Sequence, residues 1–304
     1  MKCVIGIDGG GTKTLLRMTD FARNVLFEQS GGPANICASP EAEVEKTLAE
    51  LLNASLAAIP EDGALFSVCM GSAGVVAEEN RACLARIIQN ATGCPRIRVE
   101  NDAYTALYAN LEDGVGISLT AGTGSICVGQ NANGVFARTG GWGHLFSDEG
   151  SAYAMAIAAL RRSFYGLDGR GPETRLLSDL MTACDSASPQ DLISKIYLES
   201  NNKKQIANLS LLVYHAAQAG DPVACQIIED AAEELFVLCE TVAKKLEMKK
   251  FTVVQNGGLL LKNALVRGAF NRRMQLNFPA CTILPAVRDA AWGAIQVALE
   301  ANEN

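Results

Sequence analysis

The chain has 304 residues, of which 49% are hydrophobic, and it carries a net charge of −7. No apolar run reaches the roughly 18 residues that a membrane-spanning helix needs. The N-terminus lacks the basic and apolar stretches of a signal peptide, and no Lys/Arg-rich stripe is present. These features predict a cytoplasmic α/β protein of one large or two medium domains that binds neither a membrane nor nucleic acid.

The pattern along the first part of the chain predicts three strands in a meander, followed by alternating helices and strands. Ser39 and Pro40 mark the start of the first helix, because Pro is favoured at a helix start and two acidic residues follow it. The expected strands cover residues 3–8, 14–20, 25–30, 64–74 and 96–102, and the expected helices cover 41–58, 78–91 and a segment from 103.

At Gly114 the same pattern begins again, with strand, small-residue turn and strand in GVGISLTAGTGSICVGQ and a third strand in GVFARTGG. Strand, glycine turn and helix follow in FTVVQNGGLLLKN, then a strand in CTILPAV and an amphipathic helix in RDAAWGAIQVALE. Between these parts, helices are expected at 150–165, 172–183, 188–198, 203–219 and 221–246. The chain therefore contains two copies of one topology, each with a glycine-bearing turn after its first strand.

Ten cysteines occur without a C-x-x-C motif and without zinc-finger spacing. Most lie in apolar segments such as SVCMGS and FVLCET, where Cys behaves as a small hydrophobic side chain. We therefore expect thiols in the core rather than a disulfide framework. His144 and His215 are too few for a histidine-based metal site.

The first glycine turn, in IGIDGGGTKT, combines features that suit a phosphate. Gly9, Gly10 and Gly11 allow backbone N–H groups to approach an anion closely, and Thr12 and Lys13 add a hydroxyl and a cation. The preceding acid, Asp8, follows a buried strand, where it could hold the metal ion of a phosphate. The alternative is a hairpin turn that only needs flexible residues.

Asp102 comes directly after IRVEN, at the end of the expected strand, and precedes a helix. That position holds a carboxylate at the C-terminal edge of a sheet, where α/β folds open their clefts. A carboxylate in such a position can take a proton from a bound hydroxyl group, and Asp102 is suited to that role. The alternative is an ordinary helix N-cap, which Asp favours.

Five segments appear in order across nearly the whole chain: IGIDGGGTKT, ENDAYTAL, LTAGTGSICVG, GGWGHLFSDEGSAY and VQNGGLL. Together they resemble the N-acetylglucosamine kinase branch of the actin, Hsp70 and sugar-kinase superfamily, which is grouped with the BadF/BadG-type ATPases. The segment GGWGHLFSDEGSAY is the most specific of the five. The resemblance implies an α/β, duplicated ribonuclease H-like fold, with two domains around an ATP- and sugar-binding cleft.

The same resemblance implies ATP-dependent phosphorylation of the 6-hydroxyl of N-acetylglucosamine, with N-acetylmuramic acid as a further possible substrate, in the salvage of amino sugars. It also implies Mg²⁺ and a homodimer. Residues 1–112 with the closing helix 287–304 are expected to bind sugar and phosphate, and residues 113–286 to bind the nucleotide. The sequence leaves the preferred amino sugar open.

Individual roles follow from the same resemblance. Asp102 matches the catalytic base, and Asp8 would order Mg²⁺ through water. Trp142 would cover the acetamido group, and Asp148 would accept ring hydroxyls, although this segment could also be a loop with a capping acid and a core Trp. The residues expected to contact the sugar are Asn35, Ser72, Asp102, Ser125, Gly141, Trp142 and Asp148. The residues expected to contact ATP are Gly10, Gly11, Thr12, Lys13, Gly122, Thr123, Gly124, Ala207, Gly257 and Gly258.

Three other functions are alternatives to the phosphorylation of N-acetylglucosamine. A BadF-type activator of an iron–sulfur dehydratase would need compact cysteine spacing for a cluster, which this chain lacks. A sugar-sensing transcriptional regulator would need a DNA-binding segment, whereas the first strand is expected to begin directly after Met1. A glucosamine kinase differs from the favoured function only in its sugar.

Overall fold

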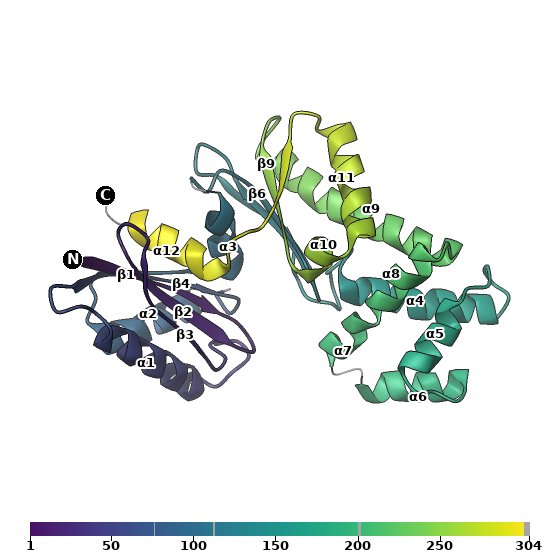
Figure 1. The fold of residues 1–304 in the computed structure, drawn as a ribbon, viewed down its shortest axis with the longest axis horizontal. Coiled ribbons are helices and arrows are strands. Elements are labelled where there is room, and N and C mark those ends of the chain that lie inside the picture. The colour runs from purple at the N-terminus through teal and green to yellow at the C-terminus, as the bar shows by residue number, and fades with distance from the viewer. Residues whose placement is uncertain (76, 112, 200–201, 301–304) are drawn as a thin grey trace. The chain divides into compact units, whose positions relative to one another are not determined.

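The computed structural model describes residues 1–75, 77–111, 113–199 and 202–300. The chain divides into two compact units, called unit 1 (Met1–Val115 with Ala286–Asn304) and unit 2 (Gly116–Pro285). Each unit contains a five-stranded sheet covered by helices (Figure 1).

Unit 1 is built on a mixed sheet with the strand order β3-β2-β1-β4-β5. Strands β1, β2 and β3 form the antiparallel meander, and β4 and β5 run parallel to β1. Its strands are β1 (Lys2–Gly9), β2 (Thr14–Asp20), β3 (Val25–Gly31), β4 (Ala64–Ser72) and β5 (Ile97–Asn101). Its helices are α1 (Glu41–Ala57), α2 (Glu78–Thr92), α3 (Asp102–Asn110) and α12 (Ala290–Glu300).

The alternation of side chains along β1 gives the sheet of unit 1 two buried faces. Ile5 and Ile7 belong to the core under α1 and α2, whereas Val4 packs with residues of α3 and α12. Helix α12, drawn in yellow in Figure 1, thus returns from the C-terminal end of the chain to the strands at the N-terminal end. Helix α12 packs closely against both β1 and α3. A Cβ on Gly6 of β1 would overlap the backbone of α12, and a Cβ on Gly293 of α12 would overlap the carbonyl of Thr105 in α3.

Unit 2 repeats this arrangement, with the strand order β10-β9-β6-β7-β8. Strand β6 takes the place of β1, since it pairs antiparallel with β7 and parallel with β9. The strands are β6 (Gly116–Ala121), β7 (Ser125–Gln130), β8 (Phe136–Gly140), β9 (Thr252–Asn256) and β10 (Thr282–Pro285). The helices are α4 (Ala152–Leu167), α5 (Leu176–Ala183), α6 (Pro189–Glu199), α7 (Lys203–Asn208), α8 (Ser210–Gln218), α9 (Pro222–Lys245), α10 (Gly258–Lys262) and α11 (Ala264–Asn277). The expected duplication of one topology is confirmed.

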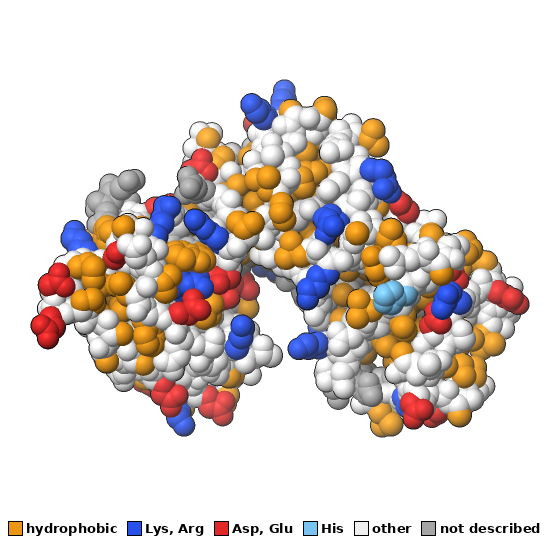
Figure 2. All heavy atoms as spheres, in the orientation of Figure 1, with side chains coloured by type: hydrophobic (Ala, Val, Ile, Leu, Met, Phe, Trp, Pro, Cys, Tyr) orange, Lys and Arg blue, Asp and Glu red, His pale blue; other side chains and the backbone are white. Residues whose placement is uncertain are grey.

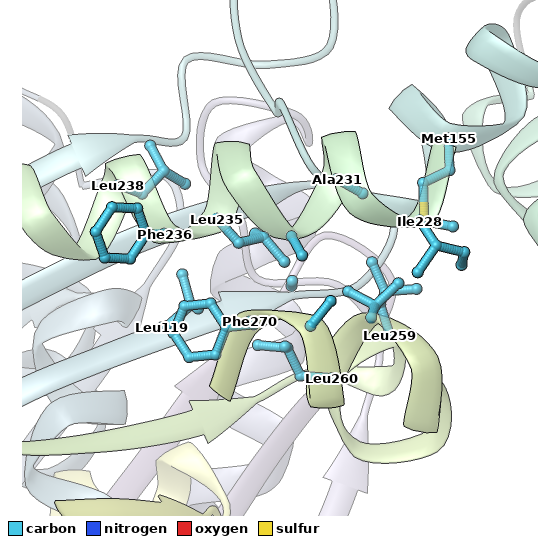
Figure 3. Close-up of a cluster of buried hydrophobic side chains, with 14 of the residues drawn as sticks. Leu119, Met155, Ile228, Ala231, Leu235, Phe236, Leu238, Leu259, Leu260 and Phe270 are labelled. Atoms are coloured by element: carbon cyan, nitrogen blue, oxygen red, sulfur yellow. The ribbon is translucent and has the colours of Figure 1, made fainter. Parts of the chain in front are cut away.

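The core of unit 2 lies between its sheet and the long helix α9 (Figure 3). Leu119 of β6, Leu235 of α9 and Leu260 of α10 surround Phe270 of α11, and all four side chains are completely buried. Burying side chains of this size contributes roughly 1.5–3 kcal/mol each. This packing holds the turns at the ends of β6 and β9 in place.

Two local expectations and one alternative reading are wrong. The helix expected over 203–219 is interrupted at Leu209, which gives α7 and α8. Helix α11 is not expected as a separate element; Asn263 ends α10 and accepts hydrogen bonds from the backbone N–H groups of Leu265 and Val266, which starts a new helix. The N-cap of α3 is Asn101 and not Asp102.

All ten cysteines are free thiols. Five of them are buried, as the apolar segments around them predict, but Cys37 and Cys225 are exposed. Among the described residues, no helix combines the length and apolarity of a membrane span. On the face that Figure 2 shows, Lys and Arg side chains are scattered among acidic and neutral ones.

Candidate active site

Three parallel strands of unit 1 end in register at one edge of the sheet. Gly9 of β1 pairs with Ser72 of β4, and Ser72 pairs with Asn101 of β5. The segments that follow these strands therefore leave the sheet side by side. The register thus brings together the turn 10–13, Ser72 and Asp102, which the sequence predicts to be site residues.

The turn 10–13 joins β1 to β2 and is held by backbone hydrogen bonds. Gly10 N–H donates to Lys13 O at 3.1 Å, and Ala34 N–H donates to Gly10 O at 3.1 Å. A Cβ on Gly10 would press on Lys13 O at 2.8 Å, whereas a Cβ on Gly11 would meet its nearest neighbour at 4.0 Å. Gly10 is thus needed by the turn itself, and the surface at Gly11 is open. Thr12 is exposed, which leaves its hydroxyl accessible.

Asp8 is a partly buried carboxyl with an unusual charge environment. Burial raises its pKa, the negative charges of Asp102 and Asp289 raise it further, and Lys13 lowers it, with the result that the pKa is about 6. The structure therefore gathers negative charge around Asp8, which a bound cation would neutralise. No group of three or more potential metal ligands occurs among the described residues. The negative charge around Asp8 fits Mg²⁺, which usually binds through one or two carboxylates and keeps several waters.

Asp102 is the first residue of α3, directly after β5. Asn101 caps the helix by accepting a hydrogen bond from Ala103 N–H at 3.0 Å, and Asp102 Oδ1 accepts from the same N–H at 2.8 Å. A negative charge is favourable at this end of a helix. Because Asn101 already caps α3, the alternative reading of Asp102 as the N-cap is wrong.

Asn35 and Ser72 lie in two segments that pack against each other beside the turn 10–13. Ser72 is fully buried, and Gly74 N–H donates to its hydroxyl at 3.4 Å. A Cβ on Gly74 would meet Asn35 Oδ1 at 2.5 Å. Asn35 Oδ1 also accepts a hydrogen bond from Cys37 N–H at 2.9 Å. The complete burial of Ser72 leaves little of it for a ligand, while Asn35 is partly exposed.

Asp289 is a residue near Asp8 that the sequence analysis does not identify. Arg17, a buried residue of β2, donates to both carboxylate oxygens of Asp289 at 2.6 and 2.9 Å and to Glu28 at 2.7 Å. Burial raises the pKa of Asp289, but the hydrogen bonds from Arg17 and from the backbone N–H groups of Trp292 and Ala291, together with the Arg17 charge, outweigh burial and lower the pKa. Asp289 also accepts from Trp292 N–H. Two features of the sequence could have indicated this ion pair: an Arg among apolar residues in β2, and an Asp just before the closing helix.

In unit 2, the turn 122–124 joins β6 to β7 and lies beside the start of α10. Gly122 N–H donates to Gly124 O, and Ala152 N–H donates to Gly122 O, both at 2.9 Å. A Cβ on Gly122 would have Gly258 N, at 3.7 Å, as its nearest neighbour, and a Cβ on Gly258 would meet nothing within 4 Å. The structure thus brings these two predicted ATP contacts together with open space beside them.

The other predicted ATP contacts of unit 2 differ in their exposure. Thr123 is exposed at the tip of its turn. Gly257 has φ of +86°, and a Cβ there would overlap Ala121 O, so the strand-to-helix connection itself requires glycine. Ala207 is 4% exposed on α7, which leaves little of its side chain for a ligand.

Asp148 connects the segment of residues 140–151 to the turn 122–124. It is 4% exposed and has φ of +68°, which is uncommon for a residue other than glycine. Its Oδ1 accepts from Ser125 N–H at 3.2 Å, and its Oδ2 pairs with Lys203 Nζ at 2.7 Å. A Cβ on Gly124 would lie 2.7 Å from Oδ2. The Ser125 hydroxyl donates to Glu149 O at 2.6 Å.

Trp142 lies on the surface, with 66% of the residue exposed, so the alternative of a core Trp is wrong. The Arg138 guanidinium lies 4.4 Å from the centre of its ring and donates to Gly141 O at 2.6 Å. Gly141 has φ of +73°, which favours glycine. An indole held in this way can cover an apolar group of a ligand.

Comparisons with known proteins identify the family of the chain. Residues 5–298 match the BadF/BadG/BcrA/BcrD ATPase family. The chain is 36% identical over 301 residues to an N-acetylmuramic acid/N-acetylglucosamine kinase of Clostridium acetobutylicum, and the match covers 98% of each protein. It is 30% identical over 313 residues to an N-acetyl-D-glucosamine kinase of Dictyostelium discoideum, again with 98% of each protein covered.

Among solved structures, a candidate N-acetylglucosamine kinase of Chromobacterium violaceum is similar with a TM-score of 0.76 at 24% identity, covering 98% of this chain and 99% of that one. At this identity the likeness shows the fold alone. Together with the repeated strand order, it confirms the expected duplicated sugar-kinase fold.

Proposed function

Because the chain belongs to the BadF/BadG/BcrA/BcrD ATPase family, we propose that it is an ATP-dependent N-acetylhexosamine kinase that phosphorylates the 6-hydroxyl of N-acetylglucosamine. The observation that carries this proposal is the shared edge of β1, β4 and β5, where Asp8, the turn 10–13 and Asp102 lie together. Two relatives that match nearly the whole chain are named as kinases of amino sugars, and these names support an amino sugar as substrate.

In the proposed reaction, Asp102 accepts the proton of the sugar hydroxyl as that hydroxyl attacks the γ-phosphate of ATP, the bond from the γ-phosphorus to the bridging oxygen breaks, and ADP leaves. Asp8 would hold Mg²⁺ through water, and the ion when bound would neutralise charge on the phosphates. Backbone N–H groups of the turns 10–13 and 122–124 would bind phosphate oxygens, while Gly257, Gly258 and Ala207 would contact the adenosine. Unit 1 would bind sugar and phosphate, and unit 2 would bind the nucleotide.

The polar groups proposed to orient the sugar are Asn35, Ser72, Ser125 and Asp148, with Trp142 and the Gly141 backbone at the acetamido group. Since the Ser125 hydroxyl already donates to Glu149 O, it would act as an acceptor for a sugar hydroxyl. N-acetylmuramic acid is a second candidate substrate, favoured by the name of the relative at 36% identity. A cytoplasmic homodimer is part of the proposal, and sedimentation of the purified protein tests the dimer.

The test is coupled ADP release by the purified protein with ATP, Mg²⁺ and a panel of sugars: N-acetylglucosamine, N-acetylmuramic acid, glucosamine and glucose. We expect the highest kcat/KM for an N-acetylated sugar, with phosphate on the 6-hydroxyl by ³¹P NMR. Asp102→Asn should lower kcat by roughly 10² to 10⁴ while ATP still binds. A preference for glucosamine would contradict the proposed substrate. ATP hydrolysis without sugar, together with bound iron, would favour the dehydratase activator instead.

A further inference from the structure

We propose that Lys203 is a positioning residue, which fixes the carboxylate of Asp148 and thereby joins sugar binding to nucleotide binding. The inference rests on the proposed function, in which Asp148 accepts hydrogen bonds from the sugar. Lys203 lies at the start of α7 and is separated from Asp148 by 55 positions in the chain.

The ion pair between these residues compensates a charge that is otherwise buried. Lys203 Nζ lies 2.7 Å from Asp148 Oδ2, and the Asp148 side chain is only 6% exposed. Removing one partner of a buried pair leaves an uncompensated charge, which is strongly unfavourable. Without Lys203, the Asp148 carboxylate would therefore be driven to change its position.

The position of Asp148 matters because the turn 122–124 is built around it. Its Oδ1 accepts from Ser125 N–H, its main-chain oxygen accepts from Ser151 N–H at 3.2 Å, and its carboxylate occupies the space next to Gly124. The positive φ of Asp148 persists only because these contacts hold it. A shift of this carboxylate would consequently move the turn that is proposed to bind ATP phosphates.

The same arrangement leaves acceptor positions on the Asp148 carboxylate unused, and a sugar hydroxyl would reach them only through the 6% of the side chain that is exposed. An ionised carboxylate has about four acceptor positions, and Ser125 and Lys203 use two of them. The Lys203 side chain is 32% exposed, and its ammonium has three donors, of which Asp148 takes one. Lys203 thus orients the carboxylate without blocking all of its acceptor positions.

The experiment compares Lys203→Met with Lys203→Arg, which keeps the charge, and with Lys204→Met, an exposed neighbour on the same helix. In Lys203→Met we expect KM for N-acetylglucosamine to rise roughly tenfold or more, with a smaller change in kcat. Lys203→Arg should restore KM to within about threefold of the original chain, and Lys204→Met should leave it unchanged. If Lys203→Met does not fold, Lys203→Gln takes its place.

A double-mutant cycle separates positioning from general damage. In an Asp148→Asn background, Lys203→Met should have little further effect on sugar KM, because its target is gone. The affinity for a non-hydrolysable ATP analogue, measured by calorimetry with and without sugar, should show coupling in the original chain that is reduced in Lys203→Met. Additive effects in the cycle, or a Lys203→Met enzyme that matches Lys204→Met, would overturn the inference. An original chain that phosphorylates no amino sugar would overturn the proposed function, before any variant is made, and this inference with it.

Discussion

The charged carboxylate of Asp8 is expected to lower the stability of the folded protein, although the same charge is proposed to bind a cation. Its pKa of about 6 means that the folded protein disfavours the charged form. Below about pH 4 the carboxyl is protonated in both the folded and the unfolded chain, so it does not affect stability. As the pH rises from about 4 to 6, Asp8 ionises more readily in the unfolded chain than in the folded one. The free energy of unfolding therefore falls with rising pH in this range. Above pH 6 this penalty stays constant.

Asp8→Asn should therefore stabilise the ligand-free protein, by at most about 3 kcal/mol at pH 7.5 and by little at pH 4. The same change should lower kinase activity, since the amide is a poorer partner for a cation. Urea unfolding of both proteins at the two pH values measures the first effect, with the exposed Glu61→Gln as control. A stability gain that is equal at both pH values would show that the charge of Asp8 is not its cause.

Substitution of Trp142 tests the proposed basis of sugar selectivity. Because its indole is exposed and held by Arg138, Trp142→Ala should cost little stability. Burial of one methyl-sized group contributes on the order of 1 kcal/mol, and a hydrophobic pocket discriminates by about 1–3 kcal/mol. We therefore expect kcat/KM for N-acetylglucosamine to fall roughly tenfold relative to glucosamine and glucose. Steady-state rates over these sugars measure this, and equal losses for all of them would remove Trp142 from the acetamido site.

At the scale of elements, the two glycine turns are predicted to differ in their response to a side chain. A side chain at Gly122 enters the open space beside Gly258, whereas one at Gly124 presses on the Asp148 carboxylate. Gly122→Val should weaken the binding of an ATP analogue with sugar affinity largely kept, and Gly124→Val should weaken both. Calorimetry with each ligand measures this, with circular dichroism to verify folding. Unchanged nucleotide affinity in both folded variants would mean that the turn is only structural.

Local patterns predict most elements of this fold but not the contacts made between them. Alternating apolar residues and glycine turns identify β1, β2, β6 and β7, because these signals lie within a few residues of each other. The break at Leu209 and the separate helix α11 have no strong signal, since one side-chain cap or one turn decides them. Asp289 with Arg17, and Lys203 with Asp148, are separated by 272 and 55 positions, so only the folded chain brings them together.

At the scale of the whole molecule, the closing helix α12 completes the core of unit 1. Gly293 lets it approach α3 so closely that a Cβ would overlap the carbonyl of Thr105. Gly293→Ala should therefore destabilise the protein by roughly 1–3 kcal/mol, the range for overpacked sites. The matched control is Gly268→Ala in α11, where the nearest atom lies 3.7 Å from the new Cβ and helix propensity favours Ala. Thermal unfolding of the two variants measures the difference, and a Gly293→Ala protein as stable as its control would contradict the close packing.

The path of the chain through the two units sets an order of events during synthesis. Residues 116–285 form unit 2 without interruption, whereas unit 1 needs both the first 115 residues and the last segment of the chain. On the ribosome, unit 2 can finish folding while the face of β1 that α12 covers is still bare. In the finished protein, Val4 on that face belongs to one buried cluster with Cys69 of the neighbouring strand β4 and with residues of α12. A nascent chain therefore exposes an apolar sheet face until α12 has been synthesised, and binding by a chaperone that recognises such surfaces would be strongest in this interval.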